Sequence, residues 1–345
     1  MTQPIRVGIA GLGRSGWNMH ADALSKLPEH YQVTAVMDLD EARRAEAEKR
    51  FGCSSTDTFE SLLDNDTDLI VVASPSHFHA EHTLAALAAG KHVMVEKPMA
   101  QNVAEADEMI AAAKRAERVL TVNQNYRFKP AFRKVNEIIA SGKLGEILQI
   151  RISVHQFGRR WDWQTLRKYN GGILTNHGAH VIDWMLQHFE DDDPKIFAFM
   201  TGTPLYAGDA DSHAKIIIQP SDGPLMDVEL THSAAYAQDY WTVMGTQGSL
   251  AGTQSELRWK YFDPASVQPL VLDEAPTPDR SYNREALPFI EETMSFPHLQ
   301  NEDMVLMYRN LTSTFREGGA PEVTPESVRR QMVLFERCRE AAGWA

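Results

Sequence analysis

A lysine at the end of a predicted strand is the first residue with a chemical role to explain. Lys97 follows the apolar run Val93–Val95 and precedes Pro98. Proline has no N–H, so it ends the strand ladder, and Lys97 is expected at the strand's carboxyl end. Open α/β sheets bind their ligands at that end. Lys97 is therefore either half of a structural ion pair or a group that stabilises a reacting oxygen.

A histidine in the second half of the chain supplies a candidate proton acceptor. Asn176 and His180 are four residues apart in an apolar stretch after Gly171 and Gly172, so they share one face if that stretch is a helix. A neutral imidazole accepts the proton of an alcohol near pH 7, and an asparagine can orient the hydroxyl. A lone helical histidine is more often a core residue, so the catalytic interpretation requires a cofactor-binding half facing it.

A glycine motif near the start predicts that half. The apolar strand Ile5–Ala10 runs into Gly11-Leu12-Gly13-Arg14-Ser15-Gly16, and a helical stretch follows. In such a loop the first glycine permits a tight turn, the second admits a pyrophosphate and the third lets the helix pack closely. The motif is weak evidence by itself. The residues expected to contact the cofactor here are Gly11, Leu12, Gly13, Arg14 and Gly16.

An aspartate after the next strand refines the cofactor. Gln32–Met37 reads as the second strand and ends at Asp38, about 20 residues beyond the glycines, where a carboxylate binds the ribose hydroxyls. An acid there favours NAD, while Arg43 and Arg44 leave NADP possible. The structural alternative for Asp38 is an acidic residue at the amino end of the helix Glu41–Arg50.

Strands and helices continue to alternate in the first third. Such alternation predicts a doubly wound parallel sheet. The turn Ser74–His79 follows a strand, so Ser74, Pro75 and His79 are expected beside the cofactor. His77, His79 and His82 have no carboxylate or cysteine partner, and we predict no metal there. The expected strands are Leu69–Ala73, the run ending at Lys97 and Val119–Val122, and the expected helices are Ala80–Ala89 and Val103–Arg118.

The pattern changes in the second half of the chain. Period-two alternation predicts an open, mostly antiparallel sheet. We place the domain boundary near residue 124, giving a nucleotide-binding Rossmann domain at 1–124 and an α+β domain for substrate binding and oligomerisation at 125–345. No Gly/Ser linker separates them, so tight packing is expected. The alternating segments are Ile147–Phe157, Lys215–Gln219, Asp227–His232 and Trp241–Met244.

A loop between these strands and His180 is a candidate substrate contact. Arg160, Trp161 and Trp163 combine guanidinium groups, which bind carboxylates or phosphates, with indole faces, which suit sugar rings. The alternative is a surface loop with partly buried tryptophans. Arg127 either reaches the cleft or braces the joint between the domains.

Composition limits the partners. The chain has 345 residues, with 47 Asp+Glu against 34 Lys+Arg and a net charge of −13, which disfavours nucleic acid and anionic membranes. No apolar run reaches the length of a membrane span, and no secretory segment precedes the first strand. Cys53 and Cys338 lack metal-type or redox-type spacing. We therefore expect a cytoplasmic protein that acts on a small molecule.

The motifs together resemble the glucose–fructose oxidoreductase/inositol dehydrogenase/MocA family. They follow the family's order from residue 5 to about residue 190, and Glu-Lys-Pro after Gly-Lys-His-Val is the most specific piece. The matching segments are Gly11–Gly16, Ser74-Pro75 with His79, Gly90–Val93 with Glu96-Lys97-Pro98, Asn125–Phe128, and Gly171-Gly172 with His180 and Asp183.

The resemblance implies roles for several residues. Lys97 would be the active-site lysine and His180 the acid/base, with Glu96 and Asn125 beside the cofactor. The second domain would carry an open sheet that often forms the oligomer interface, which suggests a homodimer or homotetramer. Many members have an aspartate where this chain has Asn176. Without that anionic partner, the basicity of His180 should be lower.

The expected reaction is oxidation of a secondary alcohol of a sugar, polyol or related compound, with hydride transfer to C4 of the nicotinamide, or its reverse. Two alternatives stay open. An NAD-dependent glycoside hydrolase would use the cofactor transiently and release a reducing sugar without net NADH. A non-catalytic NAD(P)-binding regulator would show no turnover.

Overall fold

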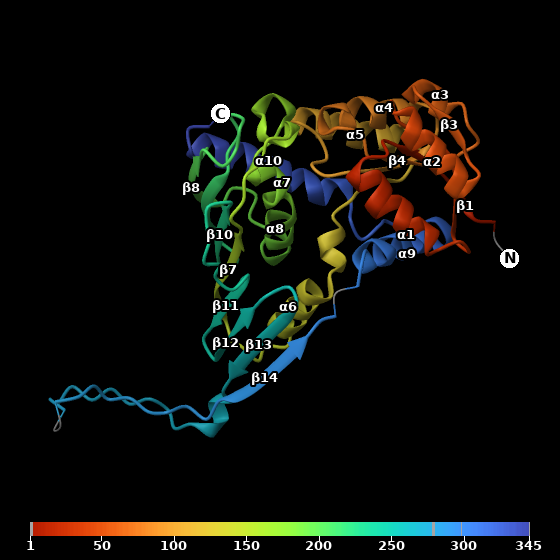
Figure 1. Ribbon diagram of the computed structural model, residues 1–345. Coiled ribbons are helices and arrows are strands. Elements are labelled where there is room, and N and C mark those ends of the chain that lie inside the picture. The colour runs from red at the N-terminus through yellow and green to blue at the C-terminus, as the bar shows by residue number, and fades with distance from the viewer. Residues whose placement is uncertain (1–2, 278–279, 298, 345) are drawn as a thin grey trace.

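Two sheets lie side by side in the computed structural model, which describes residues 3–277, 280–297 and 299–344 (Figure 1). The first sheet has the order β3-β2-β1-β4-β5-β6, and all of its strand pairs are parallel. The predicted Rossmann-type sheet is thus confirmed. Its strands are β1 (Ile5–Ala10), β2 (Tyr31–Met37), β3 (Ser54–Thr56), β4 (Leu69–Val72), β5 (His92–Val95) and β6 (Leu120–Val122).

The strands of this sheet are apolar because helices cover both of its faces. All four residues of β4 are buried, and only the short edge strand β3 escaped prediction. The side chain of Asp40 accepts the N–H of Ala42 at the start of α2, and Asn102 accepts that of Glu105 at the start of α5. The helices are η1 (Gly16–Ala21), α1 (Asp22–Ser25), α2 (Glu41–Phe51), α3 (Phe59–Leu63), η2 (Ser76–Phe78), α4 (His79–Ala88) and α5 (Val103–Ala116).

The second sheet has eight strands in the order β14-β13-β12-β11-β7-β10-β9-β8. Only the pair of β7 and β10 is parallel, so the predicted open, mostly antiparallel sheet is confirmed. The four predicted strands are present, and β8, β12, β13 and β14 are additional. The bounds are β7 (Ile147–His155), β8 (Lys195–Thr201), β9 (His213–Gln219), β10 (Leu225–Thr231), β11 (Trp241–Gly245), β12 (Gly248–Gly252), β13 (Glu256–Tyr261) and β14 (Ile290–Ser295).

One face of this sheet packs on helices and the other is partly apolar and exposed. Ile216, Ile218 and Val228 of β9 and β10 are fully buried. Helices α7 and α8 contact β10, and α10 contacts β8; Figure 1 shows these helices on one side of the sheet. On the outer side Phe197 and Phe199 of β8 are 63% and 52% exposed. The helices of this half are η3 (Asn125–Phe128), α6 (Pro130–Ala140), η4 (Trp163–Thr165), η5 (Arg167–Tyr169), α7 (Ile173–Asn176), α8 (Gly178–Met185), η6 (Leu186–His188), η7 (Pro264–Ser266), α9 (Glu302–Glu317) and α10 (Pro325–Ala341).

The last two helices return to the first sheet. Helix α9 packs against α1 and η3, and α10 packs against α5, α8 and β8. The hydroxyl of Tyr31 donates to the carbonyl oxygen of Tyr308 in α9 at 2.7 Å. These contacts join the two sheets into a continuous hydrophobic core. None of the helices in the described ranges is long and apolar enough to cross a membrane.

Between β13 and β14 the chain projects from the body as a long arm (Figure 1). Three consecutive aliphatic residues of this arm, Leu270, Val271 and Leu272, are 93%, 87% and 83% exposed. No feature of the sequence pattern described above predicts this projection.

Candidate active site

The glycine loop at the carboxyl end of β1 has the geometry that dinucleotide binding requires. Gly11 has φ +94°, and a Cβ there would lie 2.6 Å from the carbonyl oxygen of Ala73. A Cβ on Gly16 would lie 1.8 Å from the carbonyl oxygen of Gly11. At Gly13 a Cβ would meet nothing within 4 Å, so the backbone faces open space that a pyrophosphate can occupy. The loop therefore fits a dinucleotide.

Asp38 is fixed against this loop. Its carboxylate accepts the N–H of Leu12 at 2.7 Å and that of Asp40 at 2.9 Å. Arg43 Nη1 lies 3.5 Å from Asp38 Oδ2. The residue that caps helix α2 is Asp40, so Asp38 does not have that alternative role. The Asp38 carboxylate therefore lies directly beside the glycine loop, just after β2.

The turn after β4 is held to the loop after β5 by a histidine. The His79 ring nitrogens lie 2.7 Å from the carbonyl oxygen of Pro98 and 3.0 Å from that of Ser74. His79 is 2% exposed, and Pro75 leads into the short helix η2. A neutral imidazole has one N–H and can donate to only one of these carbonyl oxygens, but the buried ring still lies between the two strand ends. The turn backbone is the part left to meet a cofactor.

Glu96 lies next to Lys97 in a buried hydrogen-bond network. Its Oε1 is 3.0 Å from His20 Nε2 and accepts Asn123 Nδ2 at 2.9 Å, while Oε2 accepts the N–H of Lys97 at 3.1 Å. His20 Nδ1 lies 2.7 Å from the hydroxyl of Tyr308. Burial acts to raise the pKa of Glu96, but these partners outweigh it and the pKa falls to about 2. Glu96 thus anchors the backbone of Lys97 to η1 and α9.

Lys97 reaches from the end of β5 to Asn176 in α7. Its Nζ donates to the backbone oxygen of Asn176 at 3.0 Å and to Asn176 Oδ1 at 3.2 Å. No ion pair joins Lys97 to a carboxylate in the described ranges. Burial lowers the pKa of Lys97 to about 8, and the charges of Arg14 and Arg160 add to this while Glu96 opposes it. The structural ion-pair alternative therefore does not apply to this lysine.

The segment that carries Asn176 and His180 differs from the single helix expected. It is divided into α7 and α8, with His177 between them. The N–H of His180 donates to the carbonyl oxygen of His177 at 3.1 Å, whereas an unbroken α-helix would direct it to Asn176. The break leaves the carbonyl oxygen of Asn176 free to accept Lys97.

His180 is buried and neutral, and its ring is held by stacking rather than by a hydrogen bond at Nδ1 among the described residues. Its ring stacks on Tyr126 with 3.8 Å between centroids and 11° between planes, and its Nδ1 has no hydrogen-bond partner among the described residues. Burial lowers its pKa well below the ordinary value, and the charges of Lys97 and Lys129 add to this. The lower basicity expected for His180 agrees with this direction, with burial as the largest cause.

A cavity of about 320 Å³ opens beside His180. His177 and Tyr126 also line it, and His177 faces His232 at 5.6 Å between ring centroids. Sequence reasoning did not single out Tyr126 and His177 as lining this cavity, because their only signal was position near a motif. The other lining residues are Ser153, Val154, His155, Gln156, Gln238, Tyr240, Thr253 and Gln254.

The candidate substrate loop meets the site through one residue. Arg160 Nη2 donates to Gln164 Oε1 at 2.6 Å, and the same oxygen accepts Asn176 Nδ2 at 3.4 Å. Arg160 also pairs with Asp162 at 2.9 Å. Trp161 and Trp163 are 80% and 42% exposed. Among the three predicted loop residues, Arg160 is thus the one that hydrogen bonds connect to Asn176, by way of Gln164.

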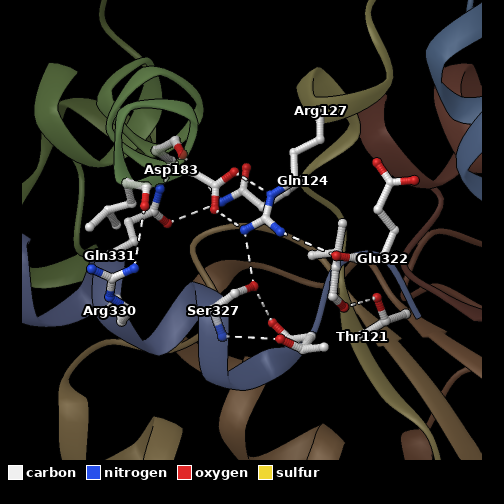
Figure 2. A network of polar contacts seen from close by, with 12 residues as sticks. Thr121, Gln124, Arg127, Asp183, Glu322, Ser327, Arg330 and Gln331 are labelled. Carbon is white, nitrogen blue, oxygen red and sulfur yellow. Dashed lines mark hydrogen bonds and ion pairs between the residues drawn. The ribbon is translucent and has the colours of Figure 1, made fainter. Parts of the chain in front are cut away.

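Arg127 braces the joint between the two halves. It donates to the Asp183 carboxylate at 2.7 and 2.6 Å and to the hydroxyl of Ser327 at 3.0 Å (Figure 2). Gln124 beside it donates to Gln331 of α10 at 3.0 Å. The neighbouring Asn125 donates to Asp303 of α9 at 2.7 Å. These side chains join η3 to α8, α9 and α10 by hydrogen bonds, and Asp183 lies in the same helix as His180. The pairing of Arg127 therefore holds that helix in place.

Comparison with known proteins identifies oxidoreductases that are similar to this chain. Residues 5–124 match the family described as "Oxidoreductase family, NAD-binding Rossmann fold", and residues 132–251 match the "GFO/IDH/MocA C-terminal domain". An uncharacterized oxidoreductase of Schizosaccharomyces pombe is 32% identical over 54% of this chain, and the chain spans 52% of that relative. Myo-inositol 2-dehydrogenase of Thermotoga maritima is 29% identical over 71% of this chain and 74% of its own.

Solved structures share the fold over almost the whole chain. A levoglucosan dehydrogenase in complex with NADH and levoglucosan superposes with a TM-score of 0.83 at 23% identity, covering 99% of this chain and 98% of that one. At that identity the likeness shows the fold. With the two family matches, the glycine loop and the lysine and histidine of the site, the chain belongs to the Gfo/Idh/MocA family of oxidoreductases.

Proposed function

We propose that this protein is an NAD(P)-dependent dehydrogenase or reductase that acts on a secondary alcohol of a sugar, polyol or related compound, with NAD preferred. The observation that carries the proposal is the contact of the Lys97 ammonium with Asn176, four residues before a neutral His180 that lines a cavity.

The chain offers a place for the cofactor. Gly11, Leu12, Gly13, Arg14 and Gly16 would hold its pyrophosphate side, and Asp38 its adenosine ribose. The backbone of the turn at Ser74 and Pro75 lies at the neighbouring strand end. When bound, the nicotinamide supplies the hydride chemistry. The carboxylate of Asp38 supports NAD, because it would repel a 2′-phosphate.

The protein's own groups would handle the proton and the charge. The ammonium of Lys97 would stabilise negative charge on the reacting oxygen, which is the largest kind of contribution in many enzymes. His180 would take the proton from the alcohol, since a buried neutral imidazole can accept one. Asn176 Oδ1 would hold Lys97 in place and help to orient the hydroxyl.

The cavity supports an uncharged, hydroxylated substrate. Its described lining has amides, hydroxyls and imidazoles and includes no carboxylate or arginine. Lys97 is not among the lining residues and approaches from the side of Asn176. The relatives named myo-inositol 2-dehydrogenase and levoglucosan dehydrogenase act, by their names, on such molecules. Arg160 is paired with Asp162, so it is less available for an anionic substrate.

An absorbance screen with NAD and NADP over sugars, polyols and sugar acids tests the proposal. We expect reduced cofactor to accumulate with a neutral polyol or sugar, and Lys97→Ala to abolish that signal. Release of a reducing sugar without net NADH would instead support the glycoside hydrolase. No turnover with any substrate, together with tight NAD binding, would support a regulator.

We also infer that the protein divides after residue 124 into its two domains and assembles as a homodimer or homotetramer through the outer face of the second sheet. Exposed Phe197 and Phe199 on that face support the assembly. Light scattering during gel filtration should give a multiple of 38.8 kDa, and Phe199→Asp should reduce the measured mass.

The free cysteines Cys53 and Cys338 agree with a cytoplasmic protein.

A further inference from the structure

Three side chains form a column at the edge of the cavity. The Nζ of Lys129 lies 3.4 Å from the centroid of the Tyr126 ring, and the imidazole of His180 stacks 3.8 Å from the same centroid. Two groups this close to one ring centroid must lie on opposite faces of the ring. Lys129 Nζ also donates to Gln254 Oε1 at 3.0 Å. The column therefore joins η3, the residue before α6, and α8.

The His180 ring lacks the usual device that orients a proton-transfer histidine. Such rings commonly donate one N–H to a carboxylate or carbonyl, which fixes both the tautomer and the plane. His180 Nδ1 has no hydrogen-bond partner in the part of the chain that the structure describes. The nearby carboxylate of Asp183 is occupied by Arg127. The plane of the imidazole must therefore be set by packing.

We propose that Tyr126, with Lys129 against its ring, is the positioning residue of His180. Stacking of the nearly parallel Tyr126 and His180 rings fixes the imidazole plane, and the ammonium of Lys129 is attracted to the electron-rich face of the Tyr126 ring. Lys129 also places a positive charge near the imidazole, which favours the neutral ring that accepts a proton. The role of His180 in this inference rests on the proposed function.

Other groups act on the same ring and must be separated from Lys129. Burial is the largest cause of the lowered pKa of His180, followed by the charge of Lys97. Tyr126 and Tyr240 also border the cavity beside it, as does His155. The remaining groups that act on the ring are the charged Lys129 and Arg14 and the titratable His177, whose own pKa burial lowers to about 3.

Direct titration of His180 in the whole protein by NMR tests the charge of Lys129 without any need for activity. Lys129→Met keeps a chain of similar length on the Tyr126 ring and removes the charge, so we expect the pKa of His180 to rise. Lys134→Met in α6 is the matched control and should leave it unchanged, because Lys134 pairs with Glu137. The resonance of His180 is assigned with His180→Gln.

Steady-state kinetics tests the stack. Tyr126→Leu removes the ring and should lower kcat by about tenfold to a hundredfold, the scale expected for a misplaced catalytic group. Tyr126→Phe keeps the ring and should restore most of kcat, which a hydroxyl-dependent role would not allow. In Lys129→Met the acid limb of the pH profile should move upward with the NMR pKa.

The two experiments separate this inference from the proposed function. If wild-type protein turns over no alcohol, the proposed function is wrong. The NMR titration of His180 in wild type and in Lys129→Met still tests the effect of Lys129 on the ring. An unchanged His180 titration in Lys129→Met, or wild-type kcat in a folded Tyr126→Leu, would overturn the inference. If Tyr126→Leu does not fold, the stack is judged from Tyr126→Phe, in which a fall of kcat by about tenfold or more would overturn the inference.

Discussion

The ammonium of Lys97 lies 3.0 Å from the backbone oxygen of Asn176, although the two residues are 79 positions apart in the chain. This contact connects the carboxyl end of β5 to the break between α7 and α8. It places the charge of a strand-end lysine beside the segment that carries His180. The two halves of the protein thereby contribute to one site.

Removing the ammonium should affect turnover more than cofactor binding. In Lys97→Ala we expect kcat to fall by about a hundredfold to a thousandfold, the loss typical of removing a group that stabilises a developing oxyanion. The glycine loop and Asp38 are untouched, so NAD affinity measured by fluorescence titration should change little. Near-normal turnover in this variant would remove Lys97 from the mechanism.

The pH dependence should follow the charge of Lys97. Its pKa is lowered to about 8, so Lys97 is fully protonated well below that pH and loses its positive charge as the pH rises through it. Alcohol oxidation at fixed cofactor concentration should therefore decline above about pH 8 in kcat/KM. The acid limb should lie below the ordinary histidine range, because the pKa of His180 is lowered. A profile that rises steadily to pH 10 would contradict this assignment.

A carboxylate at residue 176 should move that profile. Asn176→Asp would put a negative charge where Oδ1 now accepts Lys97 at 3.2 Å, which favours the charged lysine. We expect the alkaline limb to shift upward by about one unit. Asn176→Leu is the comparison, because it removes Oδ1 without adding charge and should not shift the limb upward. Equal limbs in the Asp and Leu variants would show that residue 176 does not control Lys97.

Asp38 should determine the choice between NAD and NADP. Asp38→Ser removes the carboxylate beside the glycine loop and releases Arg43, which now lies 3.5 Å from it, to pair with a 2′-phosphate. The ratio of kcat/KM for NADP to that for NAD should rise by at least about tenfold, equivalent to about 1.4 kcal/mol. Asp40→Ser is the control, because serine can still cap α2. The same shift in both variants would argue against a ribose contact by Asp38.

The Arg127–Asp183 pair should contribute to stability. The two side chains are 9% and 2% exposed, and Arg127→Met would leave a buried carboxylate unpaired. Urea unfolding should show a loss of about 3 to 5 kcal/mol. Arg133→Met, which breaks an exposed pair with Glu322, should cost about 1 kcal/mol or less. The double variant Arg127→Met/Asp183→Leu should recover part of the stability lost in Arg127→Met. Equal losses of stability in Arg127→Met and Arg133→Met would contradict a special role for the buried pair.

Much of the fold was predictable from local pattern. Strand β4 is a continuous apolar run, β1 is apolar apart from Arg6, and the burial of β9 and β10 alternates, because each face of a strand meets either core or solvent. Strand β14 was missed because five of its six residues are exposed and the segment has no clear apolar side. Its order comes from hydrogen bonds to β13, which a single segment does not reveal.

The sequence by itself determined the residue types of the site and their order: the glycine loop, Asp38, Lys97, Asn176 and His180. These follow from turn chemistry and from the positions of strand ends, which are local properties. Only the tertiary structure decided that Glu96 supports the backbone of Lys97, that Arg127 pairs with Asp183, and that the His180 ring stacks on Tyr126. Such contacts depend on how the elements pack together rather than on any local pattern, because most of them join residues far apart in the chain.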